Sequence, residues 1–193
     1  FETDRAQSLS YNLGLNVDPE DLGSTQVQGR AGVAWRPVDR FSVDLSLSYT
    51  DREALLVHRG AGQYTSFEAH QWAPRLEVDY FITAKQQIRI STQWTALKAF
   101  EDRFYRVNTE RDGPLIPTAN PDNQPDDFAI SRLTFQARYR WEIAPLSDLF
   151  IVYTRGSNLP RNSLFEFQEL FEQSWNDRIV DQFVIKLRYR LGS

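Results

Sequence analysis

The chain of 193 residues contains no cysteine and no methionine. Without cysteine there is no disulfide framework, no thiolate metal site and no cysteine nucleophile. No run of about 18 consecutive apolar residues occurs, so no segment has the sequence of a membrane-spanning helix. The missing methionine and the abrupt start at Phe1 lead us to expect one domain, residues 1–193, that is a piece of a longer protein.

Neither positive nor negative charge predominates strongly in the chain. The chain has 22 basic and 26 acidic residues, a net charge of −4, which argues against an extended nucleic-acid surface. Its mean hydropathy is negative. A transmembrane β-barrel remains compatible with that value, because only half of each strand faces lipid and the loops and lumen are polar.

A two-residue rhythm is the strongest pattern present. From Leu9 to Val17, and again from Phe41 to Tyr49 and from Phe183 to Leu191, apolar residues alternate with small, polar or charged ones. Successive side chains of a strand point to opposite faces, so each stretch predicts a strand with one apolar face. We expect eight strands, at about 7–17, 26–36, 41–50, 72–83, 88–95, 132–143, 148–155 and from 179 onward.

The connections between these strands alternate in length. Short turns are expected at 37–40, 84–86 and 144–147, and longer polar segments at the other end, including 51–62 and 99–127. Outer-membrane barrels have short periplasmic turns and longer extracellular loops. The pattern therefore predicts an all-β, antiparallel up-and-down transmembrane β-barrel in the bacterial outer membrane, with about eight strands visible, which could belong to a larger barrel. The alternative is a soluble meander barrel or sandwich with its apolar face inward.

Two residue sets follow from this interpretation. Aromatic residues near strand ends would form a girdle in contact with outer-membrane lipid: Trp35, Tyr49, Trp72, Trp94, Trp141 and Tyr189. Charged residues at the polar strand positions would face the lumen: Asp44, Arg75, Glu77, Asp79, Arg89, Arg132, Arg138, Arg140, Lys186, Arg188 and Arg190. These charges either select solutes or form an ion-pair network that fills a narrow lumen, and the mixture of signs favours the network.

The last long connection predicts a short helix. Ser163 and Glu166 fit a capping box, and Leu164, Phe167, Phe171 and Trp175 recur near helical spacing. Such a helix could cap the pore, bind a partner or lie at the lipid headgroups, although packing on neighbouring loops is favoured.

Sites for metals or catalysis are weakly indicated. Oxygen ligands cluster at Asp122, Asn123, Asp126 and Asp127, but the spacing of a calcium-binding EF-hand is absent, so no metal or cofactor is predicted. His58 and His70 are the only histidines, and no nucleophile-elbow or zinc-protease motif occurs. We therefore expect no enzyme activity, and keep a hydrolase using either histidine as the weakest option.

Three segments resemble a known family. Residues 143–153, IAPLSDLFIVY, resemble its hairpin PGSDLF(L/V)VY; residues 183–189, FVIKLRY, resemble its terminal strand; and residues 1–5, FETDR, resemble its FETN(R) segment. Together they are similar to the C-terminal β-barrel of an uncharacterised bacterial outer-membrane family that carries an N-terminal carbohydrate-binding domain of the family 9 type. The resemblance implies a missing sugar-binding domain and transfers no catalytic residue. The final Leu191-Gly192-Ser193, in place of an aromatic end, departs from it, as does a longer last connection.

These observations lead to one expected function and its rivals. We expect a non-enzymatic outer-membrane barrel that supports passage or surface handling of a solute, with a glycan as the candidate that the resemblance implies. The alternatives are a structural barrel whose extracellular loops bind partner proteins, and a soluble ligand-binding barrel.

Overall fold

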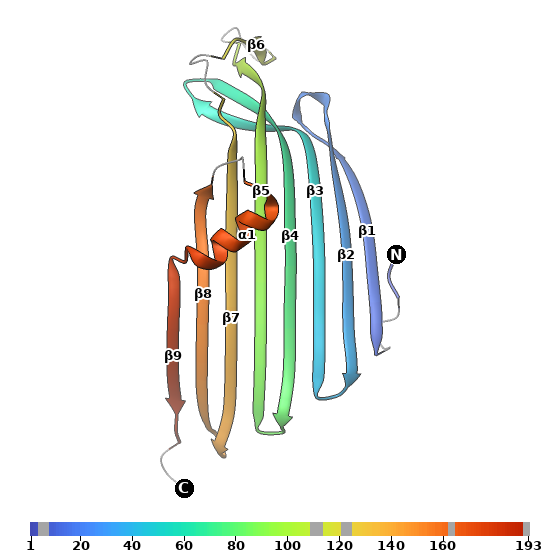
Figure 1. The fold of residues 1–193 in the computed structure, drawn as a ribbon. Coiled ribbons are helices and arrows are strands. Elements are labelled where there is room, and N and C mark those ends of the chain that lie inside the picture. Colours follow the sequence, from blue (N-terminus) through green and yellow to red (C-terminus); the bar gives the residue numbers. More distant parts are fainter. Residues whose placement is uncertain (4–7, 109–113, 121–124, 162–164, 191–193) are drawn as a thin grey trace.

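The computed structural model describes residues 1–3, 8–108, 114–120, 125–161 and 165–190. They form one antiparallel sheet of nine strands, in the order β1-β2-β3-β4-β5-β7-β8-β9, with the short β6 paired to β5 (Figure 1). Each long strand therefore neighbours the next long strand in sequence. The predicted all-β, antiparallel up-and-down arrangement is confirmed, and β6 is an element that the sequence did not indicate.

The elements have the following bounds. The strands are β1 (Leu9–Pro19), β2 (Thr25–Val38), β3 (Phe41–Gly60), β4 (Gln63–Thr83), β5 (Gln86–Arg106), β6 (Ile116–Thr118), β7 (Phe128–Ala144), β8 (Ser147–Arg161) and β9 (Val180–Arg188), and the helices are the 3-10 turn η1 (Asp21–Gly23) and α1 (Phe167–Asn176).

The register gathers the alternating residues of neighbouring strands onto common faces. Leu13 lies opposite Ala31, which lies opposite Leu47, and Ile88 lies opposite Tyr139. Because the period is two, these pairings put the apolar positions of all eight long strands on one side, here called the apolar face. The intervening positions form the polar face. Along β1 the apolar face carries Leu9, Tyr11, Leu13, Leu15 and Val17, and along β9 it carries Phe183, Ile185 and Leu187.

The prediction of a long connection at residues 51–62 is wrong. β3 continues to Gly60 and β4 begins at Gln63, so only Ala61 and Gly62 separate them, both with positive φ. The polar residues of this region are paired across a hairpin, which was hidden because the apolar–polar rhythm breaks down at its bulges. β5, β7 and β8 are likewise longer than expected, so the sheet reaches further toward the long-connection end.

The sheet does not close into a barrel. Among the described residues, β1 and β9 form its two edges and do not pair with each other. Phe1–Thr3 runs antiparallel along the outer edge of β1: the Leu13 N–H donates to the Phe1 carbonyl at 2.9 Å, and the Thr3 N–H to the Tyr11 carbonyl at 2.9 Å. Closure was predicted from the strand pattern alone, but closure depends on what pairs with the edges.

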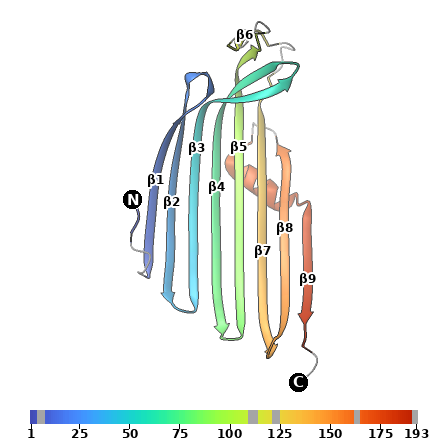
Figure 2. The ribbon, with the colours of Figure 1, turned by 180° about the vertical axis from the view of Figure 1, so that it is seen from behind.

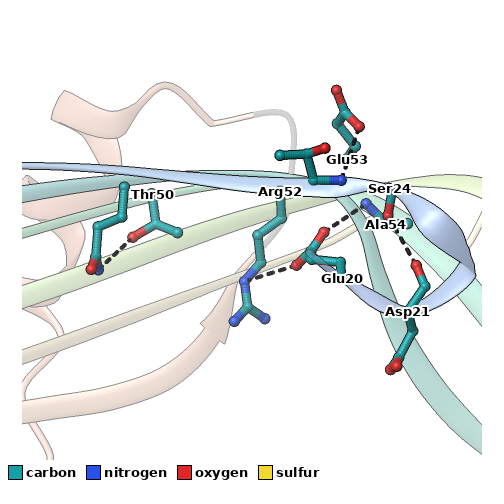
Figure 3. Close-up of polar contacts among 9 residues, drawn as sticks. Glu20, Asp21, Ser24, Thr50, Arg52, Glu53 and Ala54 are labelled. Carbon is teal, nitrogen blue, oxygen red and sulfur yellow. Dashed lines mark hydrogen bonds and ion pairs between the residues drawn. The ribbon is translucent and has the colours of Figure 1, made fainter. Parts of the chain in front are cut away.

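The β1–β2 connection folds over β3 (Figure 3). The Ala54 N–H lies in a register shift between Arg52 and Leu55, outside the ladder pairs with β4, and donates to a Glu20 carboxylate oxygen at 3.1 Å. The other Glu20 oxygen lies 3.4 Å from Arg52 Nε. The carboxylate therefore supplies the hydrogen-bond acceptor that the bulge removes, and fixes this connection to β3.

The predicted helix exists, but it starts later and packs elsewhere. Its N-cap is Glu166, which forms a capping box with Glu169, whereas Ser163 and Leu164 lie outside the described residues. α1 lies across β5, β7 and β8 (Figure 1) and is behind the sheet when the view is reversed (Figure 2). Leu170 packs with Ala96 and Ala129 in one buried cluster. The helix therefore covers part of the apolar face rather than neighbouring loops.

Candidate functional site

The polar face carries a band of charged residues near the short-turn end of the sheet. Register places the predicted lumen residues of β3, β4, β5, β7 and β9 on this one face, in adjacent rows: Asp44, Arg75, Glu77, Asp79, Arg89, Arg138, Arg140, Lys186 and Arg188. Arg132 lies on the same face nearer the long-connection end, where its Nε donates to Asn158 at 3.3 Å. Arg190 follows β9, and its backbone N–H donates to Ser147 Oγ at 3.1 Å.

On the β2–β5 side of this charged band, each acid has a basic partner. Asp44 lies 3.8 Å from Arg36, and Asp79 lies 2.8 Å from Arg89 Nε. Glu77 pairs with Arg75 on its own strand. These side chains are largely exposed, so each pair stabilises the fold by only about 0–1 kcal/mol. Their main consequence is that the charge of this half is balanced.

On the β7–β9 side, one acid serves two arginines. Asp148 is the second residue of β8 and its side chain is 2% exposed; it accepts from Arg140 Nε at 3.0 Å and also from Arg188. The pairing is possible because Asp148 lies directly opposite Arg188 and one row from Arg140. Sequence reasoning missed Asp148, although its position one residue before the apolar-face Leu149 was a usable signal.

Two cations of the band have no such partner. Within the described part of the chain, the side chains of Arg138 and Lys186 make no hydrogen bond or ion pair, and only their backbones are paired in the sheet. Their nearest polar-face neighbours on β8 are apolar, because Arg138 lies opposite Val152 and Lys186 lies opposite Phe150. Glu142, one row beyond Arg140, is the other acid on this side. The β7–β9 half of the charged band therefore carries excess positive charge.

The predicted aromatic residues lie at two levels of the apolar face. At the short-turn end, Trp35, Phe41 and Tyr80 form a chain of edge contacts with ring centroids 5.8 Å and 6.1 Å apart. Toward the other end, Tyr49 packs on Trp72 at 4.8 Å. Trp141 is exposed on β7, Tyr189 follows β9, and Trp94 is covered by Phe171 of α1 at 5.4 Å.

Beyond Tyr49 and Trp72 the character of the two faces is exchanged. The next row of the apolar face holds Asp51, His70 and Lys98. On the opposite face at this end, Phe67 and Ala99 are buried in an apolar cluster. The two-sided pattern of the sheet therefore changes at this row, toward the long-connection end.

The two histidines lie apart and lack the arrangement of a catalytic triad. His70 Nδ1 lies 2.8 Å from Asp51 Oδ1 and 3.3 Å from the Tyr49 hydroxyl. A triad uses one ring nitrogen for the acid and the other for the nucleophile, whereas both contacts here use Nδ1. His58 stacks on Tyr64, with ring centroids 4.9 Å apart.

The acidic loop holds no assembled metal site in the described residues. Asp126 pairs with Arg59, Asp127 accepts from the Glu101 N–H at 2.7 Å, and Asp122 and Asn123 lie outside the described residues. In the part of the chain that the structure describes, no three His, Cys, Asp or Glu side chains are grouped to hold a metal. Arg59 and Asp126 instead line a hollow with Phe104 and Tyr105 at the far tip of the sheet.

None of the described helices is long and apolar enough to span a membrane.

A family model described as a domain of unknown function, DUF5916, matches residues 1–192. Because this match covers almost the whole chain, the chain belongs to the DUF5916 family. No curated protein and no solved structure matches the chain.

Proposed function

We propose that this DUF5916 domain forms part of the wall of a β-barrel in the bacterial outer membrane, and that the barrel supports passage or surface handling of a solute without catalysing a reaction. In this proposal the apolar face contacts lipid and the polar face lines the lumen. The glycan implied by the family resemblance is the first solute to test.

The uncovered apolar face carries this proposal. Leu15 is 71% exposed, Phe183 63% and Leu13 57%, and large apolar side chains continue across the sheet between them. Water-soluble proteins rarely expose a contiguous apolar surface of this extent. Lipid contact removes that cost, whereas an apolar face turned inward, as in the soluble alternative, needs a second layer, which among the described residues only α1 supplies and only in part.

The height of the apolar band supports the same arrangement. On β3 the aromatic residues Phe41 and Tyr49 are eight positions apart, and on β4 so are Trp72 and Tyr80. At about 3.3 Å per residue this is roughly 26 Å along each strand. A tilted transmembrane β-strand needs about 9–11 residues, and each of these stretches, ends included, has nine. The polar row of Asp51, His70 and Lys98 then lies where the sheet would leave the hydrocarbon.

The position of α1 agrees with this boundary. The helix rests on Ala96, Ala129 and Ser131 beside Lys98, and so covers small and polar positions that lipid would solvate poorly. Its outward residues, including Gln168, Glu169 and Glu172, are exposed. An amphipathic helix with this orientation is suited to the headgroup level.

A lipid-facing sheet also needs paired edges, because hydrocarbon offers no hydrogen-bond partner to a free backbone N–H or carbonyl. Phe1–Thr3 already pairs with part of the β1 edge. The proposal therefore includes further pairing at β1 and at β9 in the assembled barrel.

Conductance of the full-length protein in planar bilayers tests the proposed passage. We expect discrete open channels, and reversible block by oligosaccharides if the solute is a glycan. The Arg140–Asp148–Arg188 network favours a second function, a closed scaffolding barrel whose loops bind partner proteins. Correctly inserted protein without conductance would reject passage and leave the scaffold.

A further inference from the structure

We infer that the polar face of β7–β9 is a binding site for anionic groups, carboxylate or phosphate, centred on Arg138 and Lys186. The inference rests on the proposed function, because it identifies the class of solute that the polar face recognises. Anion binding depends on side-chain charge and position, so failure of the proposed anion site can be separated from failure of the barrel proposal.

The first argument is the local charge balance. On the β2–β5 side Asp44, Glu77 and Asp79 each pair with an arginine. On the β7–β9 side the polar face carries Arg138, Arg140, Lys186 and Arg188 against two acids, Glu142 and Asp148. The whole chain has a net charge of −4, so this excess of cations is a local feature rather than a consequence of composition.

The second argument is geometry. β8 separates β7 from β9, and Lys186 is offset from Arg138 by two residues along the strands, so the two side chains project from backbone positions about 12 Å apart. Both side chains are long enough to reach a single anionic group held above Val152 and Phe150, which lie between them. Arg138 can offer two parallel N–H donors to a carboxylate or phosphate, and Lys186 a compact positive charge.

The third argument concerns which cations are available. Arg140 and Arg188 are already held by Asp148, whose side chain is nearly fully buried. This pairing fixes two positive charges beside the site without consuming Arg138 or Lys186. The apolar side chains of Val152 and Phe150 reduce hydration beneath an incoming anion, which strengthens its attraction to the two free cations.

The test uses the full-length protein in detergent and in planar bilayers, with inorganic phosphate as the probe. We expect phosphate to bind, as measured by equilibrium dialysis, and the double variant Arg138→Gln/Lys186→Gln to weaken binding by about tenfold or more. In bilayers we expect chloride to permeate faster than potassium, and this ratio to fall several-fold in the same variant because the local anion concentration falls.

The matched control is Arg103→Gln, which removes an exposed cation that pairs with Asp102 on β5, away from the charged band. This variant should bind phosphate like the unmodified protein. Glucuronate binding that exceeds glucose binding would identify a sugar acid as a source of the anionic group, and equal weak binding of both would leave phosphate-bearing solutes.

The outcomes separate the two proposals. Phosphate binding without conductance retains the anion site and rejects passage. A conducting channel that prefers potassium, or phosphate binding that survives in the double variant, overturns the anion site while leaving the barrel. If the protein shows no conductance and also binds no phosphate, both the proposed passage and the anion site are overturned.

Discussion

The hydroxyl oxygens of Ser131 on β7 and Ser174 on α1 lie 2.5 Å apart, with both side chains fully buried. Ser131 Oγ also accepts from the Trp94 indole N–H at 2.9 Å and lies 3.1 Å from the Leu170 carbonyl oxygen. This polar contact lies within the apolar face, and its small side chains let the helix approach the sheet closely. It fixes where α1 lies.

We therefore predict that Ser174→Leu displaces α1 from the sheet. The added volume has no space between helix and strands, and overpacking of this kind costs about 1–3 kcal/mol. Limited proteolysis should cleave the helix earlier, and fluorescence of Trp94 and Trp175 should change as Phe171 and Phe135 move away. Gln168→Leu, on the exposed side of α1, is the control and should leave cleavage unchanged; equal cleavage of both variants would contradict the packing.

Arginine substitutions test which face contacts lipid. We predict that Leu13→Arg blocks assembly, because Leu13 lies on the apolar face between the two aromatic levels and a basic residue at the bilayer midplane costs about 2–4 kcal/mol. Leu187→Arg should hinder assembly less, because Leu187 lies in the row of Trp141 at the short-turn end. Asn12→Arg, on the polar face next to Leu13, should assemble. Heat-modifiable migration in gels reports folding. Equal tolerance at all three positions would favour the soluble alternative.

Epitope tags test the orientation of the sheet. The short turn at Lys85 and the turn at Ala61 lie at opposite ends of β4, and Asn120 lies in the connection after β6. We predict that antibody reaches tags at Ala61 and Asn120, and one near Asn162, on intact cells, but reaches a tag at Lys85 only after the outer membrane is opened. The reverse pattern of labelling would invert the topology.

A disulfide tests the pairing at the β1 edge. Glu2 and Asn12 lie opposite each other between two hydrogen-bonded positions, the pairing in which Cα atoms approach most closely. Because the chain has no native cysteine, Glu2→Cys/Asn12→Cys should form a single intramolecular disulfide under mild oxidation.

The disulfide is detected as faster migration of the oxidised protein in non-reducing gels. Glu2→Cys/Asn16→Cys is the control, since Asn16 lies further along the same edge and outside this pairing. Crosslinking of the control alone would show that Phe1–Thr3 does not occupy the edge as described.

Local sequence determined most of the strands and the difference between the faces. The rhythm from Leu9 to Val17 predicted β1 to within two residues at either end, because one apolar face imposes a period of two on the sequence. A capping box was expected at Ser163 and Glu166; Ser163 lies outside the described residues, and in the structure Glu166 is itself the N-cap and forms the box with Glu169. Apart from Asp148, the charged residues predicted to face the lumen were found from parity alone.

Tertiary structure decided the rest. The tip of the β3–β4 hairpin was missed because its two faces exchange character around Phe67 and His70, so no single period describes it. The site of α1 depends on Ala96, Ala129 and Ser131, which become neighbours only when β5 and β7 pair. The division of the charged band into a balanced half and a basic half arises from contacts between strands, such as those of Asp148 with Arg140 and Arg188. The sequence shows which face of a strand each charged residue occupies, but not which charges on neighbouring strands come into contact.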